Sequence, residues 1–149
     1  MNIDELSLYD WVLYNGKPHR VEAMNRPAQM VGLCSPHFAA TTDAKNIEPM
    51  PITEDMLLHS GFEHDGTCEY ILEQKTSERE GKKHFWIKVV PPQPDNDDWW
   101  SPDQTGFEVN NDICDMLLEG IGNVYVHQLQ HVLQLAGINF YDVIKIMED

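Results

Sequence analysis

Basic residues are scarce in this sequence. Lysine and arginine together number 10, against 25 aspartates and glutamates, so the formal net charge is −15. A surface with this charge repels phosphate backbones, which disfavours direct binding to DNA or RNA. An acidic surface is typical of a strongly hydrated protein or of one that meets a basic partner. One variant of the second interpretation is a protein that imitates a nucleic acid and occupies a basic groove.

Cysteines and long apolar runs are also few. Cys34, Cys68 and Cys114 are widely spaced and form no Cys-x-x-Cys pair, which argues against a zinc ribbon. No apolar run approaches the roughly 20 residues that a membrane-spanning helix needs. The N-terminus has no basic segment followed by an apolar core, so we expect no signal peptide. These absences predict no membrane association and free thiols in a reducing cytoplasm.

The common catalytic and cofactor motifs are missing. There is no Gly-x-Ser-x-Gly, phosphate-binding loop, Gly-x-Gly-x-x-Gly or zinc-deaminase pattern, and we expect no cofactor. Cys34 and His37, in the stretch CSPH, are a candidate nucleophile and base. Nothing in the neighbouring sequence supplies an oxyanion hole for them. A small enzyme or ligand-binding domain with a histidine-containing pocket is therefore the competing interpretation to a non-enzymatic binding protein.

The first half of the chain, by contrast, carries strong β signals. The run WVLY is followed by Asn15-Gly16, in which both residues tolerate positive φ, and this predicts a β-hairpin over 10–25. Such a hairpin is compatible with an SH3-like barrel at the N-terminus. The stretch QMVGLCS predicts a further short strand. Residues 37–51, with two prolines and no clear alternation, are interpreted as a loop.

The middle of the chain predicts a short helix and a second hairpin. Thr53 is a suitable N-cap and Gly61 a suitable C-terminal stop, so we expect a helix over 53–60. Alternating apolar residues on both sides of a polar, glycine-containing link predict the second hairpin over 68–90. Two prolines end its second strand, because proline lacks the N–H that a strand ladder needs.

An acidic loop with two adjacent tryptophans follows at 91–106. Its aspartates begin like an EF-hand, but the loop glycine and the final glutamate are missing, so we expect no metal site. Tryptophan is enriched at the energetic centres of protein interfaces. The sequence therefore predicts a partner-binding site with five members: Asp95, Asp97, Asp98, Trp99 and Trp100.

The stretch YVHQLQHVLQLAG, residues 125–137, presents two histidines four residues apart. On one helix His127 and His131 would share a face, as in zinc enzymes of the His-Glu-x-x-His type, but the general-base glutamate is absent. NVYVH is β-prone, which would place His127 before the helix. The apolar spacing predicts a core-facing helix over 127–136. The two histidines are retained as possible members of a pocket, together with Cys34 and His37.

The order of these elements predicts the fold class. Strands and short helices mix without a regular βαβ rhythm, which indicates an α+β fold. We expect one domain over 1–149, with a twisted, mainly antiparallel sheet packed with two or three short helices. Asn110-Asn111 and Gly120–Gly122 are interpreted as breaks, and residues 139–147 fit a helix or a last strand equally well.

Three pieces of the chain together resemble a group of small proteins without a known activity. The pieces are WVLYNGKPHRVEAM, PITEDMLLHSGFE and YVHQLQHVLQL, in this order. The group is encoded by gut-type bacteria, their prophages and other mobile elements. The resemblance implies a phage-associated or mobile-element origin and carries over no catalytic residue. The leading interpretation is a non-enzymatic accessory protein whose partner is another protein.

Overall fold

Two antiparallel sheets organise the chain, which is described by a computed structural model. The structure describes every residue except 65–68, 75–84, 92–104, 112–114, 122 and 147–149. The residues group into two units. The first unit comprises Met1–Pro51 and Tyr125–His127, and the second comprises Ile52–Val124 and Gln128–Met147. The α+β class is confirmed, whereas the single domain over 1–149 stays a prediction.

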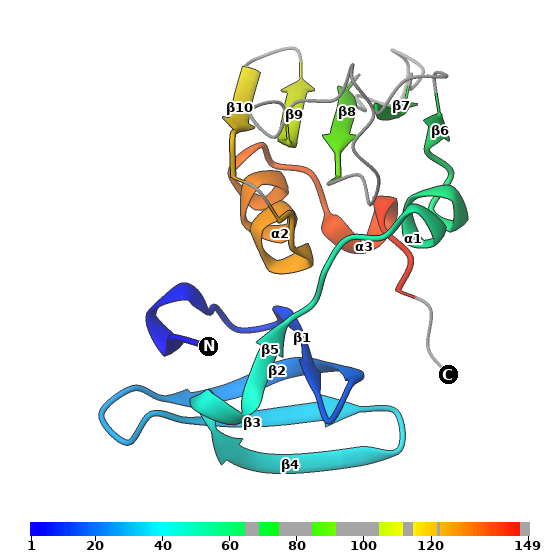
Figure 1. Cartoon of the computed structure of the whole chain (residues 1–149). Helices are drawn as coiled ribbons and strands as arrows, with labels where there is room; N and C mark the ends of the chain where they lie inside the picture. Colours follow the sequence, from blue (N-terminus) through cyan, green and yellow to red (C-terminus); the bar gives the residue numbers. More distant parts are fainter. Residues whose placement is uncertain (65–68, 75–84, 92–104, 112–114, 122, 147–149) are drawn as a thin grey trace. The chain divides into compact units, whose positions relative to one another are not determined.

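The first unit holds a five-stranded sheet with the order β4-β3-β2-β1-β5. This sheet curls into a half-barrel (Figure 1), which is the barrel-like start that the sequence indicated. The elements of this unit are η1 (Ile3–Glu5), β1 (Trp11–Tyr14), β2 (Lys17–Asn25), β3 (Met30–Ser35), β4 (Phe38–Asp43), η2 (Ala44–Asn46) and β5 (Ile47–Pro49).

The predicted first hairpin is confirmed as β1 and β2. Asn15 and Gly16 have φ values of 52° and 75°, as a two-residue turn with positive φ at both positions requires. The predicted loop at 37–51 is wrong, because this segment forms β4, η2 and β5. Register with β3 makes β4 a strand, and Asp43 begins η2 by accepting a hydrogen bond from the Lys45 N–H at 2.9 Å. The strands that pair with this segment, β1 and β3, lie elsewhere in the chain. The sequence of the segment alone therefore does not reveal that it forms strands.

The core of the first unit lies inside the half-barrel. It is built from alternate residues of the strands, together with η1 and η2, whose apolar side chains turn inward. Its fully or almost fully buried members are Ile3, Leu6, Val12, Val21, Val31, Leu33, Ala44 and Ile47.

The second unit holds another five-stranded antiparallel sheet, with the order β10-β9-β8-β7-β6. Three short helices lie together on one side of it (Figure 1). The elements are α1 (Glu54–His59), β6 (Glu63–His64), β7 (Tyr70–Gln74), β8 (Phe85–Val90), β9 (Gly106–Asn111), β10 (Asp115–Glu119), α2 (Val126–Leu135, whose first two residues are grouped with the first unit) and α3 (Phe140–Val143). Among the described helices, none has the length and apolar character needed to cross a membrane.

The local signals of α1 are confirmed. Thr53 Oγ1 accepts a hydrogen bond from the Met56 N–H at 3.3 Å, and Gly61 ends the helix with a φ of +94°. The second predicted hairpin is confirmed as β7 paired with β8. In β8, Phe85, Ile87 and Val89 are buried on the core face, as their alternation indicated.

Two expectations for the last third of the chain are corrected. Asn110-Asn111 is not a break, because both residues pair within β9. Buried Asn111 donates from Nδ2 to the Ala136 carbonyl oxygen at 2.6 Å, which explains an amide in a core strand. His127 lies inside α2, which begins at Val126, and not in a preceding strand. For residues 139–147 the sequence fitted a helix or a last strand equally well. Phe140–Val143 form the short helix α3, which Asn139 caps.

Candidate protein-binding surface

The predicted tryptophan site lies outside the described residues. This applies to all five of its members, Asp95, Asp97, Asp98, Trp99 and Trp100. The site therefore stays a prediction.

Cys34 lies near the end of β3, and His37 lies in the turn between β3 and β4. Cys34 is half-buried in β3, opposite Ala39, and its thiol donates to the Ser35 carbonyl oxygen at 3.6 Å. His37 is exposed in the two-residue turn. The thiol hydrogen bond therefore goes to the backbone and not to the imidazole, so this geometry gives a nucleophile–base pair no support.

His127 and His131 both lie on α2. His127 is buried and stacks on Tyr125, with ring centroids 5.9 Å apart and an interplanar angle of 18°. Leu129, Leu133 and Ala136 are buried, as the apolar spacing indicated. Within the described part of the chain, no three His, Cys, Asp or Glu side chains are grouped so that they could hold a metal ion. The described geometry therefore gives His127 a packing role in α2.

The strongest local feature of the first unit is a turn at residues 7–10. Tyr9 has a φ of +73°, which is strained for a bulky residue, and its side chain is 53% exposed. The turn is held by several hydrogen bonds. The Ser7 N–H donates to Asp10 Oδ2 at 2.8 Å, and the Tyr9 N–H donates to the Val21 carbonyl oxygen at 2.6 Å. The surrounding backbone thus fixes Tyr9 in a conformation that its side chain disfavours.

The Tyr9 ring and its neighbours form a mixed apolar and basic surface. The Arg20 guanidinium lies 5.8 Å from the centroid of the Tyr9 ring, within the range of a cation–π contact. Arg20 also binds Glu22, with 2.6 Å between Nη2 and Oε1. Leu8, the residue before Tyr9, is 47% exposed. Two large apolar side chains are therefore presented beside an arginine.

This surface continues into a shallow, open hollow of about 640 Å³. The hollow runs from Leu8 along the second half of β2 into the following turn. We call the whole area the Tyr9 surface, defined by Leu8, Tyr9, Arg20, Glu22, Met24, Arg26 and Pro27. Tyrosine and arginine are enriched among the residues that dominate binding energy, and methionine adapts its shape to a partner.

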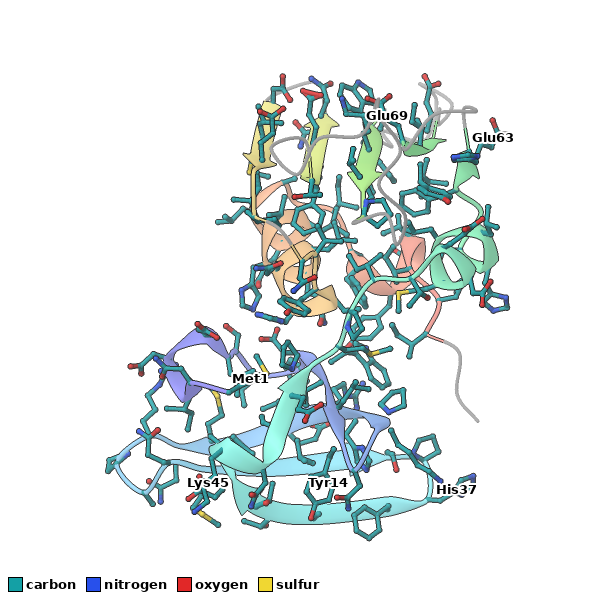
Figure 2. The ribbon with its side chains drawn as sticks, viewed as in Figure 1. Met1, Tyr14, His37, Lys45, Glu63 and Glu69 are labelled. Atoms are coloured by element: carbon teal, nitrogen blue, oxygen red, sulfur yellow. The ribbon has the colours of Figure 1, made fainter. Side chains whose placement is uncertain are left out.

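A second hollow, of about 150 Å³, lies on the second sheet and is charged. Lys88 Nζ lies 3.6 Å from Glu69 Oε1 and 3.5 Å from Glu108 Oε1, and Glu119 also lines the hollow. Figure 2 shows Glu69 at this sheet. Partly exposed ion pairs of this kind contribute about 0–1 kcal/mol each, so they shape the surface more than they stabilise it.

Sequence reasoning missed the Tyr9 surface. A signal was present, because Ser7 and Asp10 flank Leu8-Tyr9 and both are favoured at turns. The positive φ of Tyr9 depends on Val21, which is distant in the sequence, so the turn alone could not predict it.

Comparisons with known proteins add no function to this picture. No family model, curated protein or solved structure matches the chain.

Proposed function

We propose that this chain is a non-enzymatic accessory protein of a phage or mobile element that binds another protein through the Tyr9 surface. The observation that carries the proposal is the strained, half-exposed Tyr9. Backbone strain is kept at functional sites, where the surrounding structure fixes it. The origin and a cytoplasmic location are supported by the sequence resemblance and by the predicted free thiols.

The chemistry of the Tyr9 surface favours a protein partner over a nucleic acid. Its exposed groups are an aromatic ring, a leucine and arginines that carry internal acidic partners: Arg20 binds Glu22, and Arg26 Nη1 lies 3.3 Å from Asp4 Oδ1. Arginines neutralised in this way offer little to a phosphate backbone, and the net charge of −15 opposes one. A partner with an apolar anchor and a complementary polar rim fits these groups.

The test is an affinity capture from the host with wild-type protein, Tyr9→Asn and Tyr141→Asn. Asparagine tolerates positive φ, so Tyr9→Asn removes the ring and leaves the turn intact. We expect its free energy of unfolding to stay within about 1 kcal/mol of wild type, because relieved strain offsets the lost cation–π contact. We expect capture of the partner to fall at least tenfold.

Tyr141→Asn is the matched control, because Tyr141 is also a half-exposed tyrosine (43%) but lies in α3. Equal capture by Tyr9→Asn and wild type would refute the assignment of the partner to the Tyr9 surface. A double variant, Trp99→Ala with Trp100→Ala, tests the sequence-based site in the same experiment. Capture that weakens steeply between about 0.1 and 0.5 M salt would instead favour a nucleic-acid mimic.

A further inference from the structure

The edge strand β4 lacks the features that usually protect a sheet edge. Exposed edges are normally guarded by charged side chains, proline, bulges or a very short strand. β4 is six residues long, and it reads FAATTD, with no charge before Asp43. No Asp, Glu, Lys or Arg occurs anywhere in residues 27–42, although 23% of the chain is charged. Phe38 is 51% exposed, and Ala39 and Thr41 are also exposed.

The register with β3 shows which backbone groups of β4 point outward. Ser35 pairs with Phe38 across a two-residue turn, so this pair exchanges the closing hydrogen bonds. Bonded and non-bonded pairs alternate in an antiparallel ladder. Ala39 and Thr41 therefore direct their N–H and C=O groups away from β3. In the described part of the chain, β4 is the last strand of its sheet, as Figure 1 shows.

We propose that β4 is a self-association edge, at which two copies of this chain pair antiparallel about a two-fold axis. The register sets Ala39 of one copy opposite Thr41 of the other, so that each outward N–H and C=O finds a partner. Ala40 then meets Ala40 of the second copy as a non-bonded pair, where backbones approach to about 4.5 Å between Cα atoms. Two alanine side chains fit this approach without a clash.

The lack of charge along the edge favours a second copy as the occupant. In this register the His37 end of one strand meets the Asp43 end of the other, so the two Asp43 carboxylates lie at opposite ends of the paired strands. Figure 2 shows His37 at the turn into β4 and Lys45 beyond its far end. The net charge of −15 repels a second copy over most of the surface, so an uncharged edge is where two copies approach at least cost. One self-complementary patch supplies both halves of a two-fold interface.

The test is sedimentation velocity at about 1–500 μM protein, in about 0.1 and 0.5 M salt. We expect a concentration-dependent dimer that tightens at the higher salt, because screening weakens the repulsion between two acidic chains. Thr41→Pro removes an outward N–H, which an edge strand tolerates, and Thr41→Lys places a charge on the edge. Both substitutions are expected to weaken dimerisation at least tenfold.

Ala28→Lys is the matched control, because it adds the same charge at an exposed residue of the β2–β3 turn. Circular dichroism establishes that each variant is folded, and Thr41→Lys decides the matter if Thr41→Pro unfolds. A monomer at every concentration overturns the proposal. A dimer that persists in Thr41→Lys also overturns it. Tyr9→Asn is expected to leave the dimer unchanged, so this proposal and the proposed function are tested separately.

Discussion

Gly106 at the start of β9 is a position where the sheet of the second unit depends on the absence of a side chain. Its φ is +147°, and a Cβ added there would lie 1.7 Å from the Leu118 carbonyl oxygen of β10. The contact is with backbone, so no side-chain rotation relieves it. Gly106 pairs with Glu119 and with Val90, and therefore stands between two strands.

We expect Gly106→Ala to lower the free energy of unfolding by about 4 kcal/mol. Backbone strain at such a φ costs about 1–3 kcal/mol, and forcing apart packed structure costs a further 1–3 kcal/mol. For a chain of this length, about 4 kcal/mol lowers Tm by roughly 8–16 °C. Thermal unfolding followed by circular dichroism measures the shift, and hydrogen exchange reports the loss of protection in β9 and β10.

Gly16→Ala is the control that separates strain from collision. Gly16 has a φ of +75°, but no heavy atom lies within 4 Å of an added Cβ. Its substitution should therefore cost only about 1–2 kcal/mol. If Gly106→Ala and Gly16→Ala lowered Tm equally, this would contradict the inference that the Leu118 backbone collides with a side chain at Gly106.

Two further predictions concern the second unit. Asn111→Ala removes the 2.6 Å hydrogen bond to the Ala136 carbonyl oxygen and leaves that buried oxygen without this donor. We expect the free energy of unfolding, measured in urea, to fall by about 1–3 kcal/mol. A fall below about 0.5 kcal/mol would contradict the role of the amide. Burial, and then the neighbouring Glu54 carboxylate, raise the pKa of Tyr70 above its usual value of 10.0. The unfolded chain therefore ionises this tyrosine before the folded chain does, and the free energy of unfolding falls as pH rises through about 10. Tyr70→Phe should lessen that fall between pH 8.5 and 10.5 in urea titrations, and an unchanged fall would show that Tyr70 does not cause it.

Local signals in the sequence predicted the elements that are stabilised locally. Thr53 and Gly61 mark the ends of α1, and Asn15-Gly16 marks the first hairpin, because caps and tight turns depend on residues within a few positions. The assignment of β4 and β5 failed because an edge strand is defined by its neighbour in the sheet. Likewise, Asn111 resembles a break until its partner on Ala136 is known.

Among the candidate sites, too, features that depend on nearby residues were predicted, and features that depend on distant residues were missed. The sequence indicated α2 as a core helix, and its buried leucines agree. Tyr9 escaped prediction because its positive φ is imposed by hydrogen bonding to Val21, which is distant in the sequence. Composition favoured tryptophans as partner anchors and gave no means of detecting an exposed tyrosine whose backbone is strained.

The division of the chain into units has a consequence for its biosynthesis. The core of the first unit lies entirely within Ile3–Ile47, so its sheet is complete in sequence before the second unit begins at Ile52. The Met50 carbonyl oxygen accepts its hydrogen bond from the Val126 N–H, at 2.8 Å. Ribosomes add about 5–20 residues per second, so Val126 is made several seconds after Met50. The half-barrel can therefore form on the ribosome while that carbonyl is still hydrated, and the first unit gains its segment Tyr125–His127 only after most of the second unit has been made.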